Sequence, residues 1–137
     1  MKLNNLEAIQ AQTALTELSK RDDIPIRASL DIALISNMVD VQVKAYGVVL
    51  QNLYKKYSIK PEPNESGGIK FTCTAKGETE EATQKLVTEN LEAFSEKLNT
   101  LLEANTEDLK FSKIKLPSDL KIKPESLKAL VEFVEIG

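Results

Sequence analysis

The 137-residue chain contains no histidine and no tryptophan, and its single cysteine is Cys73. Without histidine it has no Ser-His-Asp or Cys-His pair, no imidazole metal ligand and no side chain whose ordinary pKa lies near neutrality. Acid–base chemistry would depend on carboxylates, lysines or tyrosines with strongly shifted pKa values. A lone cysteine cannot form an intramolecular disulfide, which agrees with a reducing compartment. The sequence therefore predicts a protein that is not an enzyme and that has no cofactor and no metal site.

Positive charge is also sparse, because the only arginines are Arg21 and Arg27 and the formal net charge is −3. Acids concentrate in residues 61–108, which hold four lysines against eleven Asp or Glu, whereas residues 109–137 hold six lysines against four acids. A duplex nucleic-acid partner requires a dense stripe of lysine and arginine that neutralises phosphates. The sequence has no such stripe, so duplex nucleic acid is not expected as a partner.

Glycine and proline are infrequent, at five each, while 42% of the residues are hydrophobic and 28% are charged. This composition is typical of an ordered globular protein, and the length suits one domain with its own core. No segment approaches the roughly twenty apolar residues of a membrane span, and residues 1–5 lack the hydrophobic block of a secretion signal. We therefore expect a single domain over residues 1–137, a cytoplasmic location and no membrane contact.

The hydrophobic pattern predicts a mainly α (α+β) fold, in which a helical bundle surrounds a long central helix. Helices are expected at about residues 4–20, 26–57, 79–104 and 124–135. Asn4 followed three residues later by Glu7 indicates a capping box at the start of the first helix. Pro25 suits the first turn of the second helix, where a backbone amide has no helical partner.

Two further segments have strand character, at about residues 69–76 and 110–116. In the first, Ile69, Phe71, Cys73 and Ala75 alternate with polar residues, which is typical of a strand with one apolar face. A strand needs a partner, and two are available: Tyr57–Pro61 across a glycine-containing turn, or Phe111–Leu116. We expect a small antiparallel sheet or hairpin, and of the two partners we adopt Phe111–Leu116.

The central segment 26–57 is apolar on more than one side. At about 100° per residue, one arc carries Ile32, Ile35, Val39, Val43, Tyr46, Leu50, Leu53 and Tyr57, and a second carries Leu30, Leu34, Met38, Val41, Ala45, Val48 and Val49. One arc can face the core, and the other must be covered by helices of the same chain or by a second molecule. Both coverings stay open at this point. If the second arc is exposed, the candidate interface is Leu34, Met38, Val41, Ala45 and Val48.

Other residue groups favour structural roles. Cys73 lies on the apolar side of a predicted strand with no histidine to activate it, so a structural thiol is expected. Tyr46, Tyr54 and Tyr57 lie near Lys55 and Lys56 and could stack on bases, but tyrosines at helical spacing are more typical of the end of a core.

The glycine-containing segment Asn64–Gly68 precedes a strand and lacks the Lys-Ser/Thr spacing of a phosphate loop, so it is interpreted as a hairpin turn. Four aspartates, Asp22, Asp23, Asp31 and Asp40, do not have calcium-loop spacing. Neither group predicts a ligand site.

The order of the predicted helices and strands resembles that of a known group of proteins. The resemblance rests on Met1–Asn4 opening a helix, Ile24–Arg27 leading a long helix that ends at Leu53–Tyr57, and Lys113–Pro117 followed by Pro124 and Leu127–Leu130. In these features the chain resembles small uncharacterised helical proteins encoded by tailed bacteriophages and prophages. The resemblance implies a bacterial host cytoplasm or a virion as the location, and no functional residue can be carried over from it.

These observations predict a non-enzymatic, phage-type protein that acts by protein–protein association, as a virion structural or assembly component. Its partner would be another protein or a second copy of itself. The alternative is an inhibitor that binds a host enzyme or defence protein through the acidic helix near residues 79–104, with Glu89, Glu92, Glu96 and Glu103 imitating a phosphate backbone. A third possibility, a small-molecule site, requires a deep pocket with two convergent polar groups, and the sequence identifies no such ligand.

Overall fold

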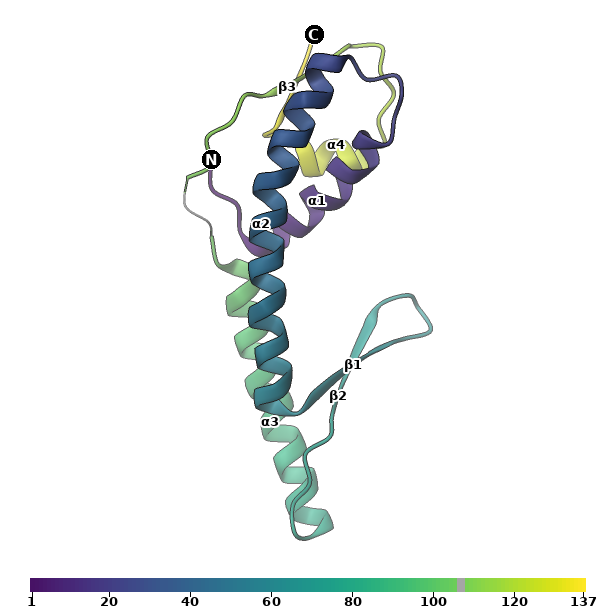
Figure 1. Ribbon diagram of the computed structural model, residues 1–137. Helices are drawn as coiled ribbons and strands as arrows, with labels where there is room; N and C mark the ends of the chain where they lie inside the picture. The colour runs from purple at the N-terminus through teal and green to yellow at the C-terminus, as the bar shows by residue number, and fades with distance from the viewer. Residues whose placement is uncertain (106–107) are drawn as a thin grey trace. The chain divides into compact units, whose positions relative to one another are not determined.

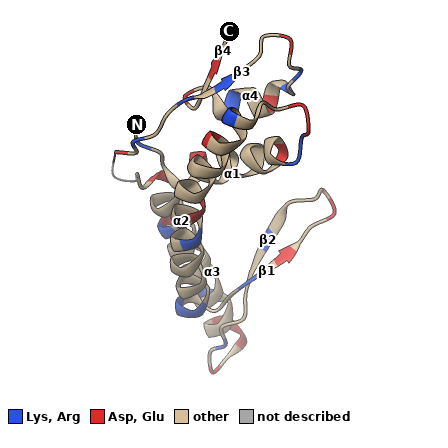
Figure 2. Cartoon of the chain, turned by 45° about the horizontal axis from the view of Figure 1, so that its top comes forward, with Lys and Arg blue, Asp and Glu red and all other residues tan. Residues whose placement is uncertain are grey.

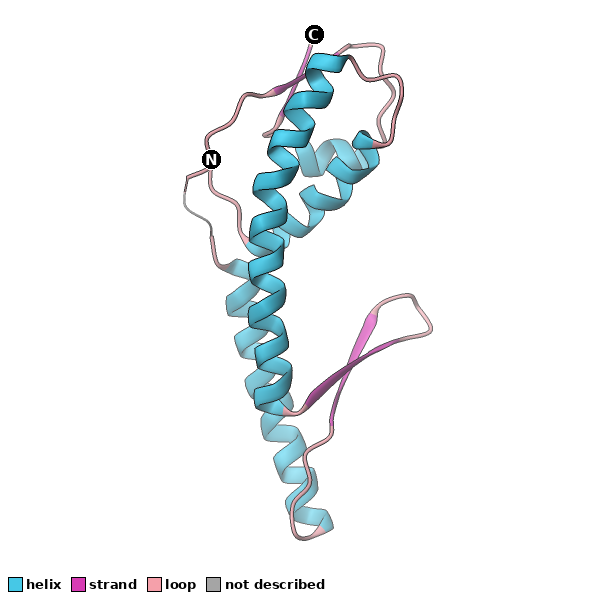
Figure 3. Cartoon of the chain, in the orientation of Figure 1, coloured by secondary structure: helices cyan, strands magenta, loops and turns pink. Residues whose placement is uncertain are grey.

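The computed structural model describes residues 1–105 and 108–137 (Figure 1). The helices in these residues are α1 (Asn5–Ser19), α2 (Ile26–Tyr57), α3 (Glu80–Glu103) and α4 (Pro124–Leu130). The strands are β1 (Ile59–Pro63), β2 (Ile69–Cys73), β3 (Ile114–Leu116) and β4 (Val134–Ile136). Helix dominates, and β1 and β2 form a small antiparallel hairpin (Figure 3). The predicted fold class is confirmed.

Contacts divide the chain into two compact units. The first comprises Met1–Ala45 with Glu103–Gly137, and the second comprises Tyr46–Leu102. Helix α2 runs through both units. The single domain expected over residues 1–137 stays a prediction.

The core of the first unit lies between α1, the N-terminal part of α2, and the C-terminal segment. Its fully buried large side chains are Leu15, Ile32, Ile35, Val39, Ile114, Leu116, Leu130 and Phe133. Three alanines of α1, Ala8, Ala11 and Ala14, are buried as well. Small side chains allow a close approach between helices, and α1 packs directly against α4. The alanines thus lie on the side of α1 that packs into the core of the first unit.

Local capping sets the start of α1. The Asn4 side chain accepts a hydrogen bond from the Glu7 amide at 2.8 Å, and the Glu7 carboxylate accepts one from the Asn4 amide at 3.1 Å. This is a complete capping box, which satisfies two amides that the helix leaves without partners. The predicted box is confirmed, and the helix begins at Asn5.

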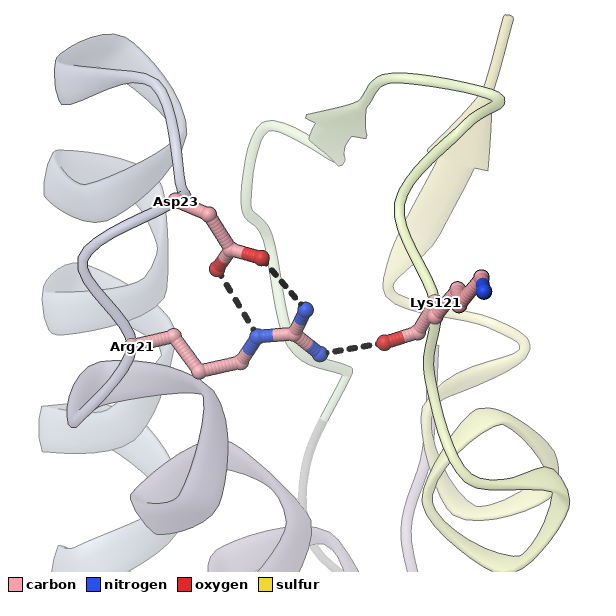
Figure 4. Close-up of polar contacts among 3 residues, drawn as sticks. All are labelled: Arg21, Asp23 and Lys121. Atoms are coloured by element: carbon pink, nitrogen blue, oxygen red, sulfur yellow. Dashed lines mark hydrogen bonds and ion pairs between the residues drawn. The ribbon is translucent and has the colours of Figure 1, made fainter.

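A salt bridge orders the turn between α1 and α2. The Arg21 guanidinium donates to both carboxylate oxygens of Asp23, at 2.9 and 2.6 Å, and to the Lys121 carbonyl at 2.5 Å (Figure 4). The hydrogen bond from Arg21 lowers the pKa of the Asp23 carboxyl below its ordinary value. Because Lys121 lies just before α4, this contact ties the α1–α2 turn to the C-terminal segment of the same unit.

The C-terminal segment departs from the prediction. Helix α4 ends at Leu130 instead of residue 135, and β4 follows and pairs with β3 in parallel, with Ile114 opposite Val134 and Leu116 opposite Ile136. The Phe133 carbonyl accepts the Ile114 amide at 2.8 Å. A helix that continued to residue 135 would remove β4, which is the partner of β3 among the described residues. Tertiary packing has therefore overridden the helical spacing of Leu127, Leu130, Val131 and Val134.

The second unit contains the C-terminal part of α2, the hairpin and α3. Ser58 has a positive φ of 54°, which turns the chain from helix into strand directly after α2. The register pairs Ile59 with Cys73 and Pro63 with Ile69. The adopted pairing of Ile69–Ala75 with Phe111–Leu116 is wrong, and the hairpin alternative is correct. A short turn closes neighbouring strands at a much smaller entropic cost than a distant segment does.

Candidate functional site: the outer face of helix α2

Helix α2 has two faces with opposite environments. Its buried side is the first predicted arc: Ile32, Ile35 and Val39 are inaccessible, and Val43, Tyr46, Leu50, Leu53 and Tyr57 are half-buried. The opposite side is the second predicted arc, and it is largely exposed. Within each unit, the described helices therefore leave most of the second arc uncovered.

The five residues of the candidate interface form the outer face of α2, namely Leu34, Met38, Val41, Ala45 and Val48. The side chains of Val41, Val48 and Leu34 are 72%, 59% and 54% exposed, Ala45 is exposed and Met38 is half-buried. An isolated exposed valine or leucine is ordinary, but a contiguous apolar strip on one helix is characteristic of an interaction surface. The structure thus brings all five residues to one side of a single element.

The strip extends further than the five predicted residues. Ile26 is 90% exposed at the start of α2, and Leu30 and Val49 are exposed as well. Leu30 and Val49 belong to the predicted second arc, whereas Ile26 belongs to neither arc. One sequence feature could have indicated that Ile26 is exposed. It directly follows Pro25 in the first turn of the helix, and a side chain there can project beyond the packed part.

Charged groups border this face without entering its centre. Near its N-terminal end, Arg27 is exposed and pairs with the buried Asp31 at 3.9 Å. On the flank, Asp40 accepts a hydrogen bond from Gln12 of α1 at 2.9 Å, and Lys44 is exposed. Two further lysines occupy the last turn of α2. Arg27 and Asp31 offset each other, and the exposed Asp40 keeps its charge four residues before Lys44, so unpaired positive charge lies mainly at the C-terminal end, on Lys55 and Lys56.

Helix α2 also has the length and composition of a possible membrane span, with a mean hydropathy of 1.2 over its most apolar 18-residue window. Its buried face forms the core of the first unit, and its Asp40 is hydrogen-bonded to α1. Core helices of soluble proteins meet the same criteria of length and hydropathy. The absence of membrane contact stays a prediction.

The acidic helix of the alternative hypothesis is α3. Glu89, Glu92, Glu96 and Glu103 are all exposed, and they lie on the side opposite the buried Phe94. Further acids, Glu80 and Glu81, occupy the first turn, where they complement the helix dipole (Figure 2). The four glutamates thus share one solvated face, as the sequence predicted, and the exposed Lys85 lies on it four residues before Glu89.

All three tyrosines of α2 are half-buried, and Tyr54 belongs to an aromatic cluster. Tyr54 contacts Phe71 and Phe94, with ring centroids 6.1 and 5.7 Å apart. Burial raises the pKa of the Tyr54 hydroxyl, and burial with a smaller contribution from Tyr54 raises the pKa of Tyr46. Lys56 lies over the ring of Tyr57 at 5.4 Å. The Tyr54 ring thus packs against two phenylalanine rings, as expected of a core residue.

The remaining candidate groups have structural partners. The Cys73 thiol is half-buried and donates to the Tyr57 carbonyl at 3.4 Å, and the Asn90 amide donates to the same carbonyl at 3.2 Å. The Asn64 side chain accepts the Gly68 amide at 2.7 Å, and Gly67 has a positive φ of 83°. The segment is a hairpin turn whose amides bind within the turn. Within residues 1–105 and 108–137, no group of three or more acidic or cysteine side chains could hold a metal ion.

Two open grooves lie on the first unit, between α1 and the segment containing α4. The larger has a volume of about 620 Å³ and is bordered by Glu7, Thr13, Glu17 and Lys128, among others. A smaller one of about 390 Å³ carries Lys20, Arg21, Lys121 and Lys123. The polar groups at their junction are paired, since Ser126 donates to Glu17 at 2.8 Å. Lys20, Lys121 and Lys123 at the smaller groove are exposed, so it does not form the deep pocket that a small-molecule site requires.

Comparison of the chain with protein-family models, with curated proteins and with solved structures finds no match.

Proposed function

We propose that this protein has no catalytic activity and works by protein–protein association through the outer face of α2. The observation that carries the proposal is the exposure of Leu34, Val41 and Val48 on a helix whose opposite side forms a core. Complete burial of an aliphatic side chain contributes about 1.5–3 kcal/mol. Because these side chains are already partly covered, a partner would gain about half of that from each.

The spacing of the outer face indicates which kind of partner fits it. The five residues follow one another at intervals of four, three, four and three. This is the heptad spacing of a coiled-coil seam, in which side chains of one helix insert between those of another. An amphipathic helix of the partner is therefore the proposed occupant.

The charges around the face refine this proposal. Lys44 is exposed beside it, and Lys55 and Lys56 follow at its C-terminal end, whereas Arg27 is paired with Asp31. Acidic residues flanking the apolar stripe of the partner helix would complement these cations. In a parallel pair of α2 helices, Lys55 and Lys56 would lie near the same lysines of the second copy. A different protein with acidic flanks therefore fits this end of the seam better.

The biological setting that we propose comes from the sequence resemblance to phage and prophage proteins. In that setting the partner is a virion or assembly protein, and the chain is located in the bacterial host cytoplasm or joins the particle. Genomic position tests this part separately: neighbouring portal, capsid or tail genes support assembly, whereas an early-gene cluster supports action on the host.

A pair of variants tests the outer face. Val41→Asp places a charge at its centre, and Ala33→Asp places the same charge at an exposed site on the flank of α2. Binding to capsid, portal and tail proteins encoded beside the chain should be lost in Val41→Asp and retained in Ala33→Asp, while both variants stay folded by circular dichroism. Equal binding by both variants would contradict the proposal, as would binding of the wild-type chain to lipid vesicles in preference to protein.

A second candidate function is supported by the exposure of Glu89, Glu92, Glu96 and Glu103 on α3. These carboxylates could occupy a phosphate-binding surface of a host enzyme or defence protein. Such binding would weaken steeply with salt, and Glu92→Lys with Glu96→Lys would abolish it. The Val41→Asp variant would retain it, which separates this candidate from the first.

A further inference from the structure

The β1–β2 hairpin has two very different edges. Among the described residues it forms a sheet of two strands only, so each strand leaves one edge without a neighbour. The Thr74 amide donates to the Ser58 carbonyl at 2.8 Å, and the Asn64 amide donates to the Gly68 carbonyl at 3.0 Å. In an antiparallel ladder such bonds alternate, so even-numbered residues of both strands face each other and odd-numbered residues direct their backbone groups outward.

Prolines block the outer edge of β1. Its outward positions are Ile59, Pro61 and Pro63, and proline has no N–H to donate. Two of the three donors that an additional strand would need are therefore missing. Prolines at such positions are a known means by which proteins prevent pairing at a sheet edge.

The outer edge of β2 is open. Its outward positions are Ile69, Phe71 and Cys73, each with an N–H and a carbonyl. Ile69 is also 64% exposed, although it lies on the apolar side of the strand. A hairpin of two strands is only marginally stable in water. Because one edge is blocked and the other is complete and apolar, the hairpin is built to accept a strand on β2 alone.

We propose that two copies of this chain associate through β2, which pairs antiparallel with β2 of the second copy and gives a four-stranded sheet. The sheet order is β1-β2-β2-β1, with a two-fold axis beside Phe71. This surface is separate from the outer face of α2, so the proposal goes beyond the proposed function and neither depends on the other.

The register follows from length and charge. When Phe71 lies opposite Phe71 of the second copy, all five residues of β2 overlap, and Ile69 lies opposite Cys73. Lys70 then lies opposite Thr72, and Glu62 of its own hairpin lies on its other side. A shift that centres the pair on Lys70 would place two lysines opposite each other, which is unfavourable. Strand length therefore selects the register centred on Phe71, and charge disfavours the one centred on Lys70.

The prolines also explain why such an assembly would stop at two copies. In the four-stranded sheet both outer edges belong to β1, and Pro61 and Pro63 block each of them. Two-fold pairing uses the same strand on both copies and is a closed arrangement. Both β2 edges are paired in the dimer, and only the proline-blocked β1 edges remain exposed. The proposal therefore predicts a dimer and not a fibre.

Substitutions of opposite charge at Thr72 test the interface on the intact chain. Thr72→Glu would face Lys70 of the second copy at two symmetric sites and Lys60 of its own hairpin, and Thr72→Lys would face both lysines with a like charge. Sedimentation equilibrium should show a concentration-dependent dimer for the wild type. Relative to it, we expect the dissociation constant to fall for Thr72→Glu and to rise about tenfold for Thr72→Lys.

Disulfide trapping tests the register. In a Cys73→Ser background, a Lys70→Cys chain is mixed with a Thr72→Cys chain under mild oxidation. These two positions form a non-hydrogen-bonded pair with Cα atoms about 4.5 Å apart, a separation that a disulfide can bridge. The mixed pair should cross-link rapidly, whereas Lys70→Cys mixed with Lys60→Cys, which lies on β1, should not.

Either of two results would overturn the proposal: a wild-type chain that stays monomeric at millimolar concentration, or a dimer whose dissociation constant is the same for Thr72→Lys and Thr72→Glu. A dimer disrupted by Val41→Asp and unaffected at Thr72 would likewise assign self-association to α2 and remove it from β2. Loss of the β2 dimer with retention of partner binding at α2 would leave the proposed function intact.

Discussion

The rings of Phe71 in β2 and Phe94 in α3 meet edge to face, with their centroids 5.0 Å apart. Phe94 is only 1% exposed, and Tyr54 of α2 contacts both rings. This aromatic cluster joins the hairpin, α3 and the end of α2 within the second unit. Other apolar side chains of α3 are only half-buried, so the stability of this unit depends on few residues.

Phe94→Ala should therefore be strongly destabilising. Replacing a buried phenylalanine by alanine costs about 3–5 kcal/mol, because contacts are lost and a cavity remains. Urea unfolding followed by circular dichroism measures this loss, and Phe94→Leu, which retains most of the volume, should cost clearly less. A loss below about 1 kcal/mol for Phe94→Ala would show that the cluster does not hold the unit together.

Two valines of α2 should respond oppositely to the same substitution. Val39 is fully buried and Val41 is largely exposed. Val39→Asp buries an unpaired charge and should cost more than about 4 kcal/mol, whereas Val41→Asp should stay within about 0.5 kcal/mol of the wild type. Thermal and urea unfolding measure both. If Val41→Asp unfolds the chain, the outer face is part of a core and the proposed function is wrong.

Removal of the α1 cap should have a moderate effect. Asn4→Ala eliminates the side-chain acceptor of the Glu7 amide, which costs about 1 kcal/mol. Asn37→Ala, at an exposed site in the middle of α2, is a suitable control and should not lower the free energy of unfolding, because alanine favours a helix interior more than asparagine does. Equal effects of the two substitutions would mean that the cap contributes nothing specific.

Alkaline pH should weaken the second unit. Burial raises the pKa of Tyr54 and of Tyr46 above the ordinary 10.0. The folded state therefore holds these protons more tightly than the unfolded state does, so the stabilisation is fully present below pH 10.0 and is lost as the pH rises through the folded-state pKa values. Urea unfolding between about pH 8 and pH 11 should show a smaller decline for Tyr54→Phe than for the wild type. An identical decline would contradict this assignment.

Opening the blocked edge should change the assembly. Pro61→Val together with Pro63→Val restores two N–H donors on the outer edge of β1. Given the β2 dimer, the new edge permits further pairing, and light scattering should detect species larger than a dimer that grow with concentration. The single variant Glu62→Gln, which leaves both prolines in place, should not form them. A double variant that stays no larger than the wild type would show that the prolines do not limit association.

Local sequence signals determined much of the fold. The capping box at Asn4 and Glu7, Pro25 at the start of α2 and the alternation of Ile69, Phe71 and Cys73 each depend on residues a few positions apart. For that reason α1, α2 and β2 occur close to where the sequence predicts them. The two apolar arcs of α2 likewise follow from the spacing of its residues alone, because a helix places residues three and four positions apart on the same side.

Long-range contacts decided the rest. The positions of α1 and α4 determined which arc of α2 is buried. The 3.6-residue period of a helix does not specify those positions. The end of α4 and the strand β4 depended on β3, about twenty residues earlier in the chain, because the Ile114 amide needed the Phe133 carbonyl. A backbone group forms its hydrogen bond with a group that tertiary packing places next to it. That packing depends on the whole folded chain and not on neighbouring residues alone.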